Sequence, residues 1–406
     1  MLFNEVIGQK DLKEQLVNMI QHNRLSHALL FLGKEGSGAL PLAIAFANYL
    51  SLPKNNTAVK NSSPGLFGDE PVTEPTPLPT TVAEIDDWMQ QQPGWSKLKD
   101  MVHPDIHFSY PVIPKKSGDK PISTDYIKEW REFIHSNPYG NAYDWLQFIG
   151  AENKQGNITA SECSDIIRKM NLKSFESEYK ILIMWMPEAL GKEGNKLLKL
   201  IEEPPPQTLF ILVAENDELV LPTILSRTQL VKVPPLSNQD VESALELRQG
   251  VSVQKAQQVA AISSGNYHEA LQQLQHAEDD WEVFLRDWLN SIVRTGPAAQ
   301  VKWIDEISKI GREKQKQFLR YFVHILEIAN RLRIIPAKTE DQNRPDVEFA
   351  LKFNKLCNIS QQEAIVKELD NASYYIERNA NAKILFHALT IKLYHIISNK
   401  SVILME

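Results

Sequence analysis

A glycine-rich turn between a short apolar run and an apolar helix constrains the fold of this chain most strongly. The run at 28–32 predicts a buried parallel strand, and residues 39–47 predict a helix. Gly33, Gly36 and Gly38 lie between them. Strand, glycine turn and helix form the context of a phosphate-binding loop, because glycines let backbone N–H groups converge on phosphate oxygens. The sequence therefore predicts an α/β architecture around this turn.

The turn lacks the side chains with which such a loop acts on a nucleotide. A working motif ends in Gly-Lys followed by Ser or Thr; the lysine neutralises phosphate charge and the hydroxyl holds Mg²⁺. Here Gly38 is followed by Ala39 and Leu40, and Lys34 lies at the opposite end of the turn. We expect a turn that has kept its shape but holds no nucleotide. Weak anion binding by N–H groups at the helix start stays open.

A second catalytic position, at the end of a central strand, also lacks its acidic residues. The apolar run at 179–186 predicts that strand. In an ATPase of this architecture it ends in Asp-Glu, where Asp holds the metal and Glu orients the attacking water. Trp185 and Met186 occupy these positions, and Glu188 follows beyond a proline. Two independent losses predict that the isolated chain is not an ATPase.

Strand and helix patterns alternate up to residue 236, and this predicts an α/β fold with a parallel sheet. Beyond it the patterns are helical. We predict an α/β core at 1–236, a small helical domain at 237–278 and an all-helical domain at 279–406. Further strands are predicted at 103–111, 208–214 and 229–233. The predicted helices of the last domain are 281–293, 300–310, 313–333, 347–357, 360–377 and 380–398.

Two stretches interrupt the α/β pattern. Residues 51–93 are rich in Pro, Thr, Ser and Asn. Such a segment buries too little apolar surface to offset its ordering entropy, so we interpret much of it as a flexible insertion. Residues 115–156 are irregular and aromatic-rich, with one predicted helix at 124–135.

Composition and charge exclude several classes of protein. A net charge of −7 argues against a stand-alone nucleic-acid-binding protein. Two cysteines, Cys163 and Cys357, are too few for a zinc site or a disulfide framework. His103, Asp105 and His107 would share one face of a strand, but without further ligands we favour a strand-edge pair over a metal site. Without a signal peptide or an apolar run of ~20 residues, we expect a cytoplasmic protein with no metal or cofactor.

An ordered series of short motifs resembles the clamp-loader branch of the AAA+ proteins. The match is strong over 1–236 and fair to about 275, and beyond that it rests on helical character and the helix start at 379–381. The motifs are Val6-Ile7-Gly8-Gln9, His27-Ala28-Leu29-Leu30-Phe31, the Gly33 turn, His103-Pro104-Asp105, Asn195-Lys196-Leu197-Leu198-Lys199 running into Glu202-Glu203-Pro204-Pro205, and Thr223-Ile224-Leu225-Ser226-Arg227-Thr228.

The resemblance implies a RecA-like AAA+ core, a helical lid, and a helical collar that joins a ring of five subunits. Such a ring opens the sliding clamp and places it on primer-template DNA, and its motor subunits hydrolyse ATP. Arg227 matches the arginine of the family's Ser-Arg-Cys motif, which reaches the phosphates of ATP held by a neighbouring subunit. Ser226 and Thr223 would set the position of that arginine.

The departures from the family pattern bear on its chemistry. Thr228 stands where the motif has cysteine, and this leaves the role of the arginine unchanged. Members often carry four cysteines in a zinc module between the loop helix and the His-Pro-Asp strand; this chain has none between Ser51 and His103, so zinc is not expected. His268 stands where ATP-binding relatives place a sensing arginine.

Several alternatives stay open. Arg227 is either an in-trans finger, which we favour, or else an ordinary surface arginine or a partner to Glu202 or Glu203. Lys196 and Lys199 either contact DNA phosphate or solvate a helix face. At the level of the whole chain, the rivals are a divergent active ATPase in replication or repair and an adaptor of some other assembly.

Overall fold

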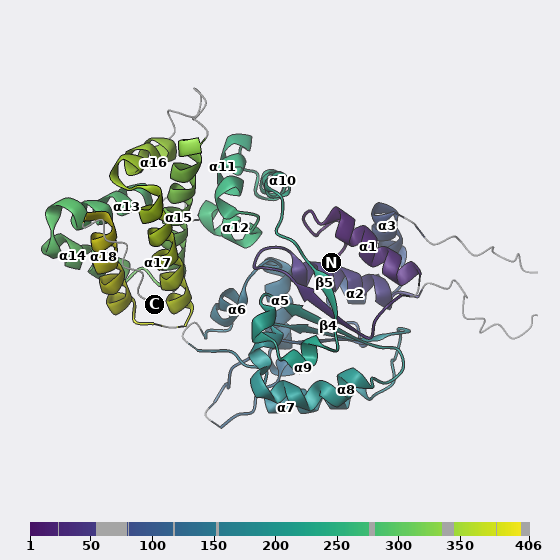
Figure 1. Cartoon of the computed structure of the whole chain (residues 1–406). Helices are drawn as coiled ribbons and strands as arrows, with labels where there is room; N and C mark the ends of the chain where they lie inside the picture. The colour runs from purple at the N-terminus through teal and green to yellow at the C-terminus, as the bar shows by residue number, and fades with distance from the viewer. Residues whose placement is uncertain are drawn as a thin grey trace, which may run out of the picture. The chain divides into compact units, whose positions relative to one another are not determined.

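The computed structural model divides the chain into two compact units, residues 1–274 and 275–406 (Figure 1). The predicted boundaries at 236/237 and 278/279 remain predictions. Each unit is described by itself below. The structure describes residues 1–22, 24–53, 79, 81–116, 118–151, 154–275, 281–334, 345–378 and 380–398.

Five parallel strands form the centre of the first unit in the order β2-β3-β4-β1-β5. Because β1 lies inside the sheet, the glycine turn that follows it opens at the carboxyl edge of the strands, where open parallel sheets bind their ligands. The α/β class with a parallel sheet is confirmed. The strands are β1 (Ala28–Leu32), β2 (Ile106–Ser109), β3 (Lys180–Trp185), β4 (Thr208–Ala214) and β5 (Gln229–Lys232).

Helices cover both faces of this sheet, because successive strand residues point to opposite sides. In β1, Leu29 and Phe31 join one core, whereas Ala28 and Leu30 join the other. The first core also takes residues from α1 (Lys10–Gln21), α2 (Ala39–Ser51), α3 (Val82–Gln91), α4 (Trp95–Lys99) and α5 (Ile127–Ser136). The second takes residues from α7 (Ala160–Met170), η2 (Pro187–Leu197), α8 (Leu198–Glu202) and α9 (Pro222–Leu225).

Part of the segment predicted to be flexible is a helix, so the prediction for 51–93 is wrong at its C-terminal end. Thr81 and Glu84 form a capping box that starts α3, and Ile85 and Met89 are buried in the first core. Composition averaged over the segment concealed this short amphipathic stretch. Residues 54–78 and 80 lie outside the described residues.

The second stretch predicted to be irregular also contains an unpredicted helix. The expected helix forms as η1 (Ser123–Tyr126) and α5, and α6 (Ala142–Phe148) follows it. Asn141 and Asp144 form the capping box of α6, and Trp145 is fully buried with its indole N–H donating to the Pro111 carbonyl at 2.7 Å. Short length and high aromatic content concealed this helix from periodicity.

The short helix η3 (Asp217–Leu219) precedes α9. After β5, three helices complete the first unit, and they share a core with residues from its beginning. Val241, Leu245 and Val259 of this helical part pack together with Ile7 and Tyr139. The helices are α10 (Asn238–Gln249), α11 (Val253–Ser263) and α12 (Tyr267–Gln275).

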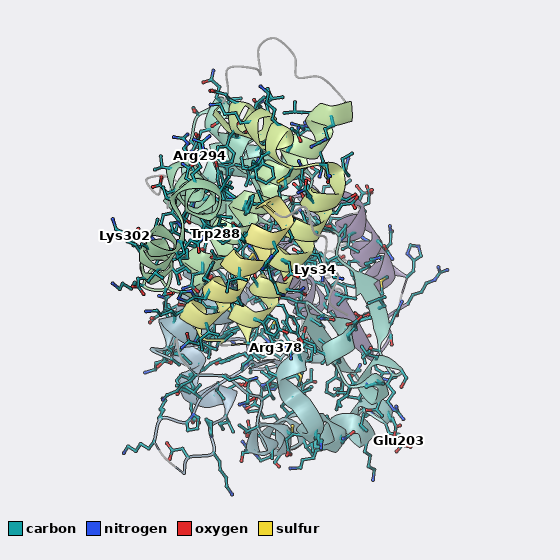
Figure 2. The ribbon with its side chains drawn as sticks, turned by 60° about the vertical axis from the view of Figure 1, so that its left-hand side comes forward. Lys34, Glu203, Trp288, Arg294, Lys302 and Arg378 are labelled. Atoms are coloured by element: carbon teal, nitrogen blue, oxygen red, sulfur yellow. The ribbon has the colours of Figure 1, made fainter. Side chains whose placement is uncertain are left out.

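The second unit is helical throughout its described residues. Trp288 lies in its core, where its ring stacks on that of Trp303 at 4.5 Å between ring centroids (Figure 2). Its last helix, α18, buries Phe386 and Leu389 but exposes 69% of Ile384 and 57% of Ile391. The elements are α13 (Trp281–Asn290), η4 (Ser291–Thr295), α14 (Pro297–Ile307), α15 (Arg312–Ile334), α16 (Pro345–Leu356), α17 (Ile359–Glu377) and α18 (Ala382–Ser398).

Candidate functional site

The glycine turn joins β1 to α2 through two glycines in the left-handed region. Gly36 and Gly38 have φ angles of +71° and +87°, in the left-handed region that glycine adopts without strain. Gly38 is the N-cap of α2, and no side chain caps this helix start. Gly33 is fixed to the sheet by its N–H bond to the Ala214 carbonyl at 3.0 Å. The turn therefore lies between a strand and a helix, as the sequence predicted.

Residues of the helical part cover this turn. The carbonyl of Gly36 accepts a hydrogen bond from the Tyr267 backbone N–H at 3.2 Å. The Asn266 side chain lies so close that a Cβ atom at Gly36 would meet its Oδ1 at 1.9 Å. On the other side, the Tyr139 ring packs on Gly38 and its hydroxyl accepts from the Ile7 N–H at 2.7 Å. The space above the turn is therefore filled by protein.

A buried ionic cluster joins the turn to α12 and α6. His268 is 4% exposed; its Nδ1 lies 2.9 Å from Glu35 Oε1, and its Nε2 lies 2.6 Å from Asp144 Oδ2. Burial disfavours the imidazolium, but hydrogen bonds to Asp144 and Glu35 outweigh burial and raise the pKa of His268 to about 10. At neutral pH, His268 is thus a cation between two carboxylates. The sequence had marked His268 only as a missing arginine.

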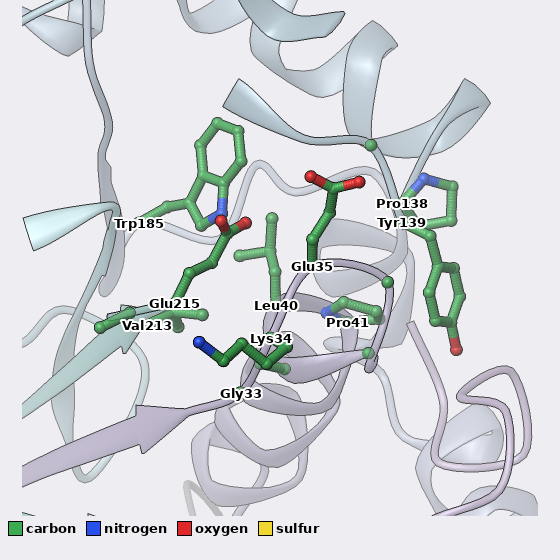
Figure 3. Close-up of a pocket in the computed structure, with 15 residues that line it drawn as sticks. Gly33, Lys34, Glu35, Leu40, Pro41, Pro138, Tyr139, Trp185, Val213 and Glu215 are labelled. Atoms are coloured by element: carbon green, nitrogen blue, oxygen red, sulfur yellow. The ribbon is translucent and has the colours of Figure 1, made fainter. Parts of the chain in front are cut away.

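The hollow at the turn is small. Its volume is about 30 Å³, whereas small-molecule pockets typically have roughly 300–1,000 Å³. Leu40, Pro41 and Trp185 are among the side chains that line it (Figure 3). Ala39 and Leu40, at the positions where a working motif has Lys and Ser or Thr, are 7% and 5% exposed.

The end of β3 offers no carboxylate to this hollow. Trp185 ends the strand and is 3% exposed, and Met186 follows with a φ of +58°. Glu188 does not line the hollow: its Oε1 accepts the backbone N–H groups of Glu215 and Asn216 at 2.7 and 2.9 Å. Burial raises the pKa of Glu188 despite these two bonds. The Glu188 carboxylate therefore fixes the chain after β4.

Arg227 lies apart from the hollow, just after α9, and is engaged within its own chain. Its Nε and Nη2 contact the Glu202 carboxylate of α8, and its Nη1 donates to the Thr223 carbonyl at 2.7 Å and to the Ser226 hydroxyl at 3.1 Å. The Arg227 side chain is 32% exposed. The structure thus brings the predicted arginine together with both predicted supporting residues, and Glu202 is its carboxylate partner.

His103, Asp105 and His107 do not share the face of one strand, because β2 begins only at Ile106. Asp105 accepts three backbone N–H bonds, from residues 175 to 177, at 2.6–2.8 Å. Burial opposes its charge, but these bonds outweigh burial and lower the pKa of Asp105. The His-Pro-Asp motif therefore anchors a loop. The described residues hold no group of three potential ligands suited to a metal ion.

The parallel sheet and the order of motifs are similar to those of AAA+ proteins of the clamp-loader type. A family model described as "DNA polymerase III, delta subunit" matches residues 140–237. The DNA polymerase III subunit delta-prime of Bacillus subtilis is 24% identical over 257 residues, which cover 63% of this chain and 56% of that protein. The chain is thus similar to the delta-prime subunit, and the resemblance predicted from its motifs is confirmed.

Other similar proteins belong to neighbouring classes. The DNA polymerase III subunit gamma/tau of Mycobacterium tuberculosis (strain H37Rv) is 30% identical over 130 residues, 28% of this chain and 22% of that protein. The chain thus spans 56% and 22% of the lengths of these two relatives.

Two solved structures are similar at low sequence identity. A gamma subunit-related protein of Thermotoga maritima is 13% identical, with a TM-score of 0.36 over 93% of this chain and 98% of that chain. A RuvB mutant of the same organism is 12% identical, with a TM-score of 0.36 over 82% of this chain and 78% of that chain.

Proposed function

We propose that this chain is a non-catalytic subunit of a DNA polymerase III clamp loader. The observation that carries the proposal is the covered glycine turn: Asn266 lies against Gly36, Tyr139 packs on Gly38, and Ala39 and Leu40 stand where a working motif has Lys and Ser or Thr. A chain that keeps this fold without room for ATP is suited to binding and assembly rather than to hydrolysis. Similarity to delta-prime and gamma/tau subunits supports the same assignment.

In this function the chain joins ATP-hydrolysing motor subunits and the other clamp-loader subunits in a hetero-oligomer. Through that complex it acts on the sliding clamp and on primer-template DNA in the cytoplasm. The isolated chain is not an enzyme and holds no cofactor or metal, although it belongs to a nucleotidyltransferase assembly. Arg227 is its catalytic contribution: an arginine finger donated to ATP on the neighbouring motor subunit, with Ser226 supporting it. A guanidinium supplied in trans stabilises the charge that develops on the γ-phosphoryl oxygens.

Isolated, folded protein will not bind a fluorescent ATP analogue in the presence of Mg²⁺. The physical reason is the hollow of about 30 Å³ and the lack of a lysine or hydroxyl where phosphate and metal would lie. Titration by fluorescence anisotropy measures this, with competing ATP as the specificity control and circular dichroism to verify folding. Specific binding at micromolar ATP would instead establish the rival, a divergent active ATPase.

The exposed apolar face of α18 supports assembly through the helical unit. Ile384 and Ile391 form an apolar side of this helix that is exposed in the isolated chain. Ile391→Glu will therefore weaken co-elution with the motor subunits, because burying a charge in an interface costs free energy. The isolated variant will stay folded. Size-exclusion chromatography of a reconstituted mixture measures it.

Val301→Glu is the matched control, because Val301 is 45% exposed on α14 of the same unit. It will leave co-elution unchanged. If Ile391→Glu assembles as well as Val301→Glu, the α18 face is not the contact. If the unchanged chain fails to co-elute with motor subunits at all, the adaptor rival gains support.

A further inference from the structure

The guanidinium of Arg227 has a partner at each of its three nitrogen atoms. The Nη1 acceptors, the Thr223 carbonyl and the Ser226 hydroxyl, are neutral and belong to the same short turn as the arginine. The partner of Nε and Nη2 is different in kind: Glu202 is an anion and comes from α8. The short turn thus binds Nη1 of the guanidinium, and a separate helix binds Nε and Nη2.

Glu202 occupies the edge of Arg227 that a phosphate would need. The N–H groups at one edge of a guanidinium suit carboxylate and phosphate oxygens alike, and in Arg227 both contact Oε1 of Glu202. While Nε and Nη2 contact Glu202, neither can donate to a γ-phosphoryl group at that edge. The carboxylate is therefore a competitor of the nucleotide for the arginine.

The ion pair of Arg227 and Glu202 is suited to exchange of the carboxylate for a phosphate group. The side chains of Arg227 and Glu202 are 32% and 44% exposed, so a neighbouring chain can reach both. An exposed ion pair contributes little free energy, because water and salt screen it. A triphosphate offers more negative charge to the same guanidinium than one carboxylate does.

We propose that Glu202 is a positioning residue. Its carboxylate holds the Arg227 guanidinium in place until the triphosphate of a neighbouring subunit displaces the carboxylate. The proposal rests on the proposed function, in which Arg227 acts on ATP held by another subunit. Thr223 and Ser226 stay hydrogen-bonded to Nη1 during this exchange. The guanidinium therefore only rotates about that contact and does not have to find a new position. Glu202 thereby lowers the rate of ATP hydrolysis in rings in which the interface between the two subunits has not yet formed.

Glu203 provides a matched control next to Glu202 in the chain. It follows the last residue of α8 and is exposed, and Figure 2 shows it at the surface of the first unit. Substitution of either glutamate by glutamine removes one negative charge from the same part of the surface. Of the two, only Glu202 contacts Arg227 in the part of the chain that the structure describes.

The test is ATP hydrolysis by the reconstituted complex without clamp or DNA. Glu202→Gln will raise the rate by a factor of up to about five, the size expected for release of an exposed ion pair. Glu203→Gln will leave the rate unchanged. The double variant Glu202→Gln/Arg227→Ala will hydrolyse ATP at the rate of Arg227→Ala alone, because the effect of Glu202 passes through the arginine.

The outcomes separate the two proposals. If Arg227→Ala slows hydrolysis but Glu202→Gln leaves it unchanged or slows it, the positioning role of Glu202 is overturned and the in-trans role of Arg227 stands. If Arg227→Ala itself has no effect, the in-trans role fails. A second readout needs no complex: in isolated protein with ¹⁵N-labelled arginine, Glu202→Gln will shift the Nε–H resonance of Arg227 and Glu203→Gln will not. An unchanged resonance in both variants also overturns the pairing.

Discussion

Replacing Arg227 with alanine will slow ATP hydrolysis by about 10³-fold or more at the motor site that this chain serves. The expected size is that of an arginine finger supplied in trans, about 10³–10⁵ in rate where it has been measured in GTPases. Assembly will be unchanged, because Arg227 is a partly exposed side chain at the end of a short helix. Single-turnover hydrolysis, in a complex whose other motor sites are inactivated, isolates the affected site.

Two further variants define what the arginine supplies. Arg227→Lys keeps the charge but loses the planar fork, so it will recover only a small part of the rate. Arg294→Ala, at an exposed position in the second unit, is the control for a general loss of positive charge. A complex with Arg227→Ala that assembles and hydrolyses ATP at the unaltered rate would rule out the finger.

Replacing His268 with glutamine will destabilise the first unit by about 3 kcal/mol or more near neutral pH. Removing one partner of a buried ionic group costs roughly 3–5 kcal/mol, because the remaining charges stay buried without compensation. Here Glu35 and Asp144 would be left without the cation between them. Urea unfolding followed by intrinsic fluorescence measures the loss, and His135→Gln, at an exposed histidine of the same unit, is the control.

The same cluster predicts a pH dependence with a definite sign. The pKa of His268 is raised to about 10 in the folded chain and is about 6.5 when unfolded. Its stabilisation is therefore complete below pH 6.5 and is lost as the pH rises toward 10. Glu35, Asp144 and Gln272 contact the imidazole, and Asn266 donates to Glu35. The difference in stability between wild type and His268→Gln will shrink between pH 7 and 9.5; a constant difference would contradict a charged His268.

The sequence predicted most of what depends on local pattern. Continuous apolar runs located the strands of the sheet, and the glycines between 28–32 and 39–47 located the turn. The all-helical pattern beyond residue 279 also agrees with the described helices. These features were readable because each is encoded in a few consecutive residues.

The sequence did not predict the contacts that close the turn. Glu35 and His268 are 233 residues apart, and neither lies in a pattern that points to the other. The three backbone bonds to Asp105 likewise come from residues about 70 positions further along the chain. The pairing of Arg227 with Glu202 was one of two open alternatives, because a flexible charged side chain gives no periodic signal. Such contacts depend on tertiary structure.

The covered turn also has a consequence for how such a chain evolves. Two substitutions, at Ala39 and Leu40, would rewrite the motif, yet Asn266 would still lie against Gly36 and Tyr139 against Gly38. Each reverting substitution gives no advantage without the others, and several would disturb a packed interior. Under the proposed function, a chain with this turn therefore changes more readily at its surface than at the turn.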